Sequence, residues 1–152
     1  MRKRSSYRPK GVRLDNMSWL KAGFMPVGRV PTAGIHLKVA NMSALDALTL
    51  GQGTGIHSHT LREAFEMALC LTRINADLGA DLLPELQAAK DASFAAHARG
   101  EASGRFLFTG PEMQAVKLGM EIHIQQLDAC TVQELERALL LAVKEKQNEA
   151  AA

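Results

Sequence analysis

The sequence predicts one mainly α-helical domain: an all-α helical bundle, with at most a minor two-stranded element, behind a flexible basic N-terminal arm. Ala and Leu are abundant while aromatic residues make up only 5% of the chain, which is typical of helices packed through small and aliphatic side chains. Three Thr-x-x-Glu motifs precede segments with helical apolar spacing. The length of 152 residues and the hydrophobic fraction of 47% suit a single domain with a sizeable core.

The first thirteen residues form a strongly basic segment. They carry six of the 18 Lys and Arg residues and no acidic residue. The six are Arg2, Lys3, Arg4, Arg8, Lys10 and Arg13. The rest of the chain, with 12 basic and 16 acidic residues, has a net charge of −4. Because Pro9 disfavours helix at the preceding residue and like charges repel, residues 1–13 are predicted to be an extended arm.

Short elements joined by Gly and Pro are predicted between the arm and the first long helix. Asn16 is a candidate N-cap for a short helix. The apolar residues of that helix are Met17, Trp19, Leu20 and Phe24. Residues 27–34 read as a loop, and the period-two alternation of residues 35–39 predicts a short strand or an extended segment. Residues 105–108 are a candidate short strand that would pair with it. A short helix from Ser43 ends at Gly51, and residues 51–55 form a flexible connection.

Four long helices are predicted to follow. Their ranges are 61–78, 82–98, 111–129 and 132–147. The capping boxes are Thr60-x-x-Glu63, Thr109-x-x-Glu112 and Thr131-x-x-Glu134. Gly79 and Gly100 end the first two helices. The segment 61–78 is apolar around much of its circumference and is expected to be central. The predicted domain therefore covers residues 14–147, and residues 148–152 form a disordered tail.

Cysteine usage and hydropathy favour a soluble intracellular protein. Cys70 and Cys130 are too few for a disulfide scaffold and are expected to be reduced core thiols. No apolar segment follows the basic start, so no signal peptide is expected. The longest purely apolar run, 138–143, is far shorter than a membrane span, so no membrane partner is expected.

The basic arm is the main candidate binding site. Its candidate contact residues are Arg2, Lys3, Arg4, Tyr7, Arg8, Lys10 and Arg13. Cations bind phosphate with release of counterions, and an aromatic ring stacks on bases, so the expected partner is nucleic acid or an acidic protein surface. A solvated tail, or an arm docked on the protein's own acidic body, remains an open alternative. No long helix presents a row of Arg, Lys, Asn and Gln, so a helix-turn-helix is not predicted.

The sequence contains no defensible catalytic or cofactor motif. His57 and His59 are weak candidate metal ligands, because a His-x-His pair needs further ligands from a distant segment. Neither a Cys-x-x-Cys nor a His-Glu-x-x-His motif is present, so no metal, cofactor or enzymatic activity is expected. His123 borders an apolar helix face and is predicted to be buried and hydrogen-bonded. The Gly51–Gly55 segment lacks the Gly-Lys-Ser/Thr ending of a phosphate loop and is interpreted as a hinge.

The last helix offers a second candidate surface. Leu135, Leu139 and Val143 share one face of it and are candidate interface residues. A monomer of this size either buries such a face completely or uses it to form a homo-oligomer, and both interpretations remain open.

Both ends of the chain resemble a group of phage proteins. Met1–Asp15 (MRKRSSYRPKGVRLD) and Gln126–Glu136 (QLDACTVQELE) are similar to the ends of small uncharacterised proteins encoded by bacteriophages and prophages, and the middle is similar only loosely. The resemblance implies a phage origin and a soluble life in the bacterial host cytoplasm. No activity is assigned to the group, so it transfers no functional residue.

The expected function is therefore non-enzymatic binding. The leading hypothesis is a regulatory or host-interacting phage accessory protein, whose arm engages nucleic acid or an acidic partner. The alternative is a protein-only inhibitor, adaptor or structural oligomer that acts through its apolar helical face, with a bacterial host protein as a candidate partner.

Overall fold

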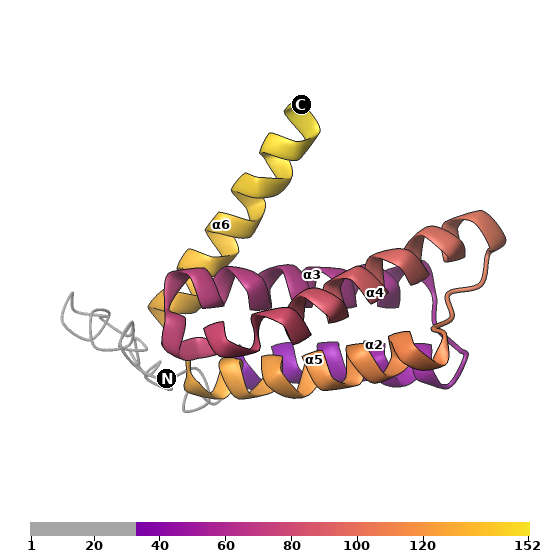
Figure 1. The fold of residues 1–152 in the computed structure, drawn as a ribbon, viewed down its shortest axis with the longest axis horizontal. Helices are drawn as coiled ribbons and strands as arrows, with labels where there is room; N and C mark the ends of the chain where they lie inside the picture. The colour runs from indigo at the N-terminus through magenta and orange to yellow at the C-terminus, as the bar shows by residue number, and fades with distance from the viewer. Residues whose placement is uncertain (1–32) are drawn as a thin grey trace, which may run out of the picture.

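The computed structural model describes residues 33–152, with side chains described from His36 onward, and this range contains five α-helices (Figure 1). They are α2 (Ala33–Thr49), α3 (Gly55–Ile74), α4 (Leu83–Ser103), α5 (Gly110–Ala129) and α6 (Val132–Ala151). Two short 3-10 helices, η2 (Ala76–Leu78) and η3 (Ala80–Leu82), join α3 to α4. Residues 33–152 contain no strand, which confirms the predicted all-α class. The basic arm and the helix predicted after Asn16 lie outside the described residues.

Helices α2 to α5 lie side by side as a four-helix bundle, and α6 leaves one end of it at an angle (Figure 1). In the bundle α2 packs on α3 and α5, and α4 packs on the same two helices. Helix α3 contacts all four other helices, as the wide apolar circumference of its sequence predicted. Among the helices of residues 33–152, α6 packs mainly on α3.

The core of the bundle is built from aliphatic side chains around one aromatic ring. Phe65 of α3 is fully buried among Leu61, Leu48 and Met120. Where α4 and α5 cross, Gly119 faces Ala89 so closely that a Cβ atom on Gly119 would lie 2.3 Å from the Ala89 Cβ atom. Small residues at this crossing let the two backbones approach, so the scarcity of aromatics and the abundance of Ala serve close helix packing.

Two of the three predicted capping boxes are confirmed. The Thr109 hydroxyl accepts from the Glu112 backbone N–H at 3.4 Å, and the Glu112 carboxylate accepts from the Thr109 N–H at 2.8 Å. Thr131 and Glu134 make the same reciprocal pair at 3.2 and 2.8 Å. These contacts satisfy N–H groups that have no partner within the helix, and α5 and α6 begin directly after the two threonines.

The predicted cap at Thr60 is wrong, because α3 begins five residues earlier, at Gly55. Thr60 lies inside the helix and its hydroxyl donates to the Ile56 carbonyl at 3.0 Å. The N-cap is Thr54, whose backbone N–H donates to Nδ1 of His57 at 3.1 Å. A histidine thus occupies the place of the usual Glu in the box.

The strand predicted at residues 35–39 is also wrong, since these residues belong to α2. The buried positions of that helix are Asn41, Ala44, Leu45 and Leu48. Their spacing is helical, and a helix fixed by that buried face extends through the five alternating residues before it. Residues 105–108 belong to the connection between α4 and α5 and form no strand in the described chain.

Some helix ends differ from the prediction. The helix predicted to reach residue 78 ends at Ile74. Helix α4 passes through Gly100 and ends before Gly104, whose φ of 74° is left-handed. Gly100 is required for packing, because a Cβ atom there would lie 2.1 Å from the Phe106 ring. Helix α6 continues to Ala151, four residues past the predicted end and into the segment 148–152 that was assigned to a disordered tail.

Candidate functional surfaces

Charge is divided unequally between the two parts of the chain. Residues 1–32 hold eight Lys and Arg against one Asp, a net charge of +7 with histidine neutral. Residues 33–152 hold ten Lys and Arg against fifteen Asp and Glu, a net charge of −5. The helical body alone would therefore repel a polyanion, and the net charge of +2 for the whole chain depends on its first 32 residues.

Most cations of the helical body are already engaged within it. Four basic side chains form ion pairs with carboxylates: Lys38 with Asp128, Arg73 with Glu145, Arg99 with Glu112, and Lys146 with Glu63 and Glu66. The guanidinium of Arg62 stacks 4.1 Å from the centre of the Phe94 ring, and Lys90 lies 5.3 Å from the same ring. The cations without such a partner in residues 33–152 are Arg105, Lys117, Arg137 and Lys144. They are spread over the α4–α5 connection, α5 and α6 and form no continuous basic stripe.

The predicted metal candidates His57 and His59 are placed at the start of α3 and bind other groups. His57 caps the helix through Thr54. His59 Nε2 lies 3.1 Å from a carboxylate oxygen of Glu63, one helical turn further on. Among residues 33–152, no group of three or more His, Cys, Asp or Glu side chains has metal-ligand geometry. The structure thus does not bring the two rings together with a third ligand.

A Ser–His–Glu arrangement connects α3 and α4 and was not predicted. The Ser58 hydroxyl lies 3.0 Å from Nδ1 of His97, and Nε2 of the same ring lies 3.9 Å from the Glu101 carboxylate. Burial lowers the pKa of His97 below its ordinary value of 6.5, which favours the neutral ring. Ser58 is only 4% exposed, and the distance to Glu101 is too long for a hydrogen bond. The arrangement joins two helices and does not present a nucleophile to a substrate.

His123 is buried and hydrogen-bonded, as predicted. Its Nδ1 lies 3.1 Å from the Gln126 side-chain oxygen, and Gln126 Nε2 donates to the backbone carbonyls of Ala68 at 3.1 Å and Leu78 at 2.7 Å. This network ties α5 to α3 and to η2. Burial lowers the pKa of His123 to about 4. A histidine enclosed in this way stabilises the junction and is not available as a general base.

Both cysteines are buried free thiols in one apolar cluster, where α3, α5 and α6 meet. Burial raises the pKa of the Cys130 thiol to about 11 and raises that of Cys70 as well. At pH 7 both remain protonated and are poor nucleophiles, which agrees with the predicted core role.

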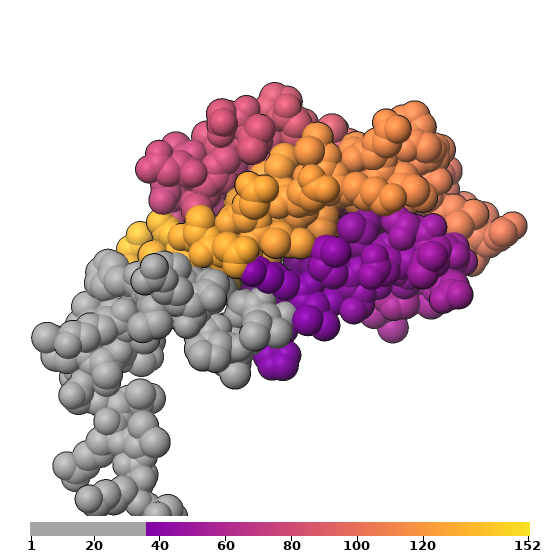
Figure 2. Space-filling model, turned by 90° about the horizontal axis from the view of Figure 1, so that it is seen from below, coloured from indigo at the N-terminus to yellow at the C-terminus, as the bar shows by residue number. Residues whose placement is uncertain are grey.

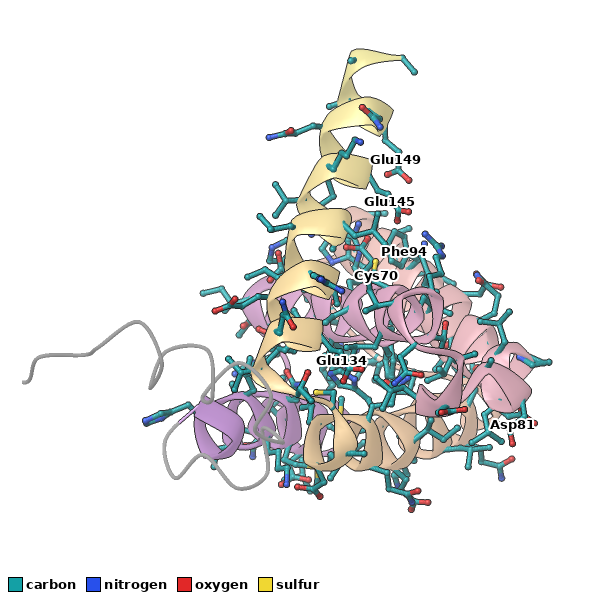
Figure 3. The ribbon with its side chains drawn as sticks, turned by 90° about the vertical axis from the view of Figure 1, so that its left-hand side faces the viewer. Cys70, Asp81, Phe94, Glu134, Glu145 and Glu149 are labelled. Carbon is teal, nitrogen blue, oxygen red and sulfur yellow. The ribbon has the colours of Figure 1, made fainter. Side chains whose placement is uncertain are left out.

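Polar contacts hold α6 against α3. Lys146 binds Glu63 at 3.1 Å and Glu66 at 3.0 Å, and the Asn75 amide donates to Glu134 at 2.9 Å. Figure 3 shows Glu145 and Glu149 on one side of α6, toward Phe94 and Cys70, with Glu134 at the base of the helix. This side of α6 is therefore occupied by its own bundle.

Another side of α6 is apolar and uncovered in the described structure. The exposed fractions are 50% for Leu139, 70% for Leu140 and 45% for Val143. Leu135, the third predicted interface residue, is half-buried against the cysteine cluster. Leu139 and Val143 are therefore exposed, as the interface hypothesis requires, and Leu140 is exposed beside them. Leu135 instead contributes mainly to the packing of α6 on the rest of the protein.

A shallow pocket of about 300 Å³ lies between α2 and α5, two helices that run side by side on the face shown in Figure 2. Its apolar lining includes Met42, Leu45, Met120 and Ile124. Asp46, Lys117 and Glu121 also line it, so the pocket combines an apolar floor with three charged side chains.

No helix in residues 33–152 is both long enough and apolar enough to cross a lipid bilayer. Comparison of the chain with family models, with curated proteins and with solved structures finds no match.

Proposed function

We propose that this protein is a non-catalytic binding protein whose N-terminal residues 2–13 contact the phosphates of a nucleic acid. The observation that carries the proposal is the separation of charge, +7 in residues 1–32 and −5 in residues 33–152. Each phosphate contact by Lys or Arg releases condensed counterions, which makes such an arm a sequence-independent source of affinity. The resemblance of both chain ends to phage proteins supports the role of a phage accessory protein in a bacterial cytoplasm.

The distribution of ion pairs in the body supports the same assignment. Its paired cations would have to break contacts such as Arg99–Glu112 before binding a phosphate. The acidic body would also be repelled by the nucleic acid, so we expect contact through the arm with the bundle held at a distance.

A salt series with full-length protein tests the proposal. Labelled mixed-sequence DNA and RNA are titrated at about 50 to 200 mM salt, and six phosphate contacts predict a slope of log affinity against log salt of about −5 on duplex DNA. The test variant replaces all six arm cations with Gln. The control replaces Arg105, Lys117 and Arg137 of the body with Gln and is expected to bind like the wild type.

Two results would contradict the proposal. One is equal binding by the arm variant and the wild type at low salt. The other is a wild-type slope near zero. Equal affinity for poly-glutamate of matched length would instead favour an acidic protein surface as the partner of the arm, because only a nucleic acid also offers bases on which Tyr7 can stack.

The alternative function, a protein-only adaptor or structural oligomer, is supported by a separate observation. Leu139, Leu140 and Val143 form an apolar surface on α6 that the other described residues leave exposed, and α6 packs mainly on α3 among the described helices. Grouped exposed apolar side chains of this kind are typical of protein interfaces.

A further inference from the structure

Helix α6 presents apolar side chains in two directions. Ala138, Leu141 and Ala142 pack toward α3. Leu140 follows Ala138 by two residues and is therefore rotated by about 200° from it around the helix axis. Leu139 and Val143 lie between these two directions. The exposed apolar surface of α6 thus extends from the edge of the face that packs on α3 to the side that faces away from the bundle.

Opposite charges lie on either side of Leu140. Glu136, Leu140 and Lys144 are spaced four residues apart and form one ridge of α6. Glu136 and Lys144 have no ion pair within residues 33–152. The ridge therefore carries an unpaired acid, an exposed leucine and an unpaired base in that order.

We propose that α6 pairs antiparallel with α6 of a second copy of this chain, with Leu140 close to the twofold axis. In this arrangement Glu136 of each copy faces the partner's Lys144, and Leu139 and Val143 cover the partner's Leu140. This inference rests on the alternative function above and is independent of the basic arm.

The order of the charged residues along α6 favours a second copy of α6 as the partner helix, and it favours the antiparallel orientation of that helix. A twofold axis through Leu140 repeats the same ridge in reverse, so one surface supplies both halves of two ion pairs. Parallel pairing would instead place Glu136 against Glu136 and Lys144 against Lys144. Antiparallel pairing also aligns the two helix dipoles favourably.

The expected dimer is weak. A single pair of helices offers less surface than the roughly 800 Å² per partner of a standard interface, so we expect a dissociation constant on the order of micromolar. Helix α6 projects from the bundle, and the other helices of residues 33–152 leave its outward side uncovered (Figure 1).

Sedimentation equilibrium of the full-length protein from about 1 to about 200 µM tests the dimer. The wild-type mass is expected to rise from 16.5 kDa toward twice that value. Leu140→Glu places two carboxylates at the axis and is expected to remain monomeric. Leu118→Glu is the matched control, because Leu118 is an exposed leucine on α5, away from the ridge.

Charge reversal tests the antiparallel direction. Glu136→Lys and Lys144→Glu each create two like-charge contacts in the dimer, and each is expected to weaken it about tenfold. The double variant restores opposite charges and is expected to dimerise within about threefold of the wild type. Thermal unfolding of each variant verifies that it remains folded.

A wild-type protein that stays monomeric throughout this range would overturn the inference. So would a dimer that Leu140→Glu does not weaken, or single reversals without effect. The same samples are titrated with DNA, so that loss of the dimer and loss of arm binding are observed separately.

Discussion

Replacement of Gly119 with Ala is expected to destabilise the folded protein by about 1–3 kcal/mol. The same change in an open helix position would stabilise by up to about 1 kcal/mol, because Ala is the better helix former. The reversal has a steric cause. A Cβ atom on Gly119 would lie 2.3 Å from the Ala89 Cβ atom and 3.0 Å from Cε1 of Phe65. The added methyl group must push α4 and α5 apart or displace the central aromatic ring of the core.

A swap of the two small residues isolates that contact. In Ala89→Gly/Gly119→Ala the methyl group moves from α4 to α5, so only the Phe65 contact remains tight. We expect the double variant to be more stable than the sum of the single effects by at least about 1 kcal/mol in urea unfolding. Gly110→Ala serves as the control, because a Cβ atom there meets nothing within 4 Å. Additive effects of the two single changes would contradict close packing at this crossing.

Local signals in the sequence were sufficient to predict the fold class and the ends of the best-capped helices. Thr109 and Thr131 each precede a Glu at the right spacing and an apolar-periodic segment, and both cap as expected. The same motif at Thr60 did not mark a helix start, because Thr and Glu three residues apart also occur inside helices, as they do here within α3. The sequence before it already contained Thr54, but His57 in place of Glu concealed the box.

The remaining errors came from interactions between distant segments. Residues 35–39 alternate locally, yet the buried face of α2 that follows extends the helix through them. Gly100 follows a segment with helical apolar spacing, and a glycine in that place usually indicates a helix end. Its place inside α4 is explained by the Phe106 ring, which packs where a Cβ atom would lie, and nothing in the local pattern indicates that contact.

The candidate sites were predictable to different degrees. His123 and the two cysteines border apolar stripes, so their burial followed from helical spacing. The exposure of Leu139 and Val143 depends on which side of α6 meets α3, and spacing alone left that open. Ser58 and His97 are 39 residues apart and share no motif, so their contact required the three-dimensional structure.

The protein is expected to lose about 2 kcal/mol of folding stability between pH 7 and pH 5 through His123 alone. The side chain is only 1% exposed, and desolvation by burial lowers its pKa from 6.5 to about 4 against the opposing effect of its hydrogen bond to Gln126. No charged neighbour contributes to this shift. Below about pH 6.5 the unfolded chain binds a proton that the folded state excludes. This contribution to stability is therefore complete above pH 6.5, falls as the pH decreases and levels off below about pH 4.

Urea unfolding at pH 7, 6 and 5 measures the slope, and His123→Gln is the diagnostic variant. Glutamine keeps an amide donor near Gln126 but does not titrate, so the free energy of unfolding of the variant is expected to change little between pH 7 and pH 5. At pH 7 the variant is expected to be less stable than the wild type, because the buried imidazole and its hydrogen bond are lost. His97→Gln is the matched control, because the His97 side chain is 20% exposed and should alter the slope less. The paired carboxylate of Glu112, whose pKa is lowered by its hydrogen bond to Arg99, titrates below its ordinary value of 4.5 and hence outside this pH range. A wild-type slope unchanged by His123→Gln would show that this ring accepts a proton without unfolding, in conflict with its enclosure between α5 and α3.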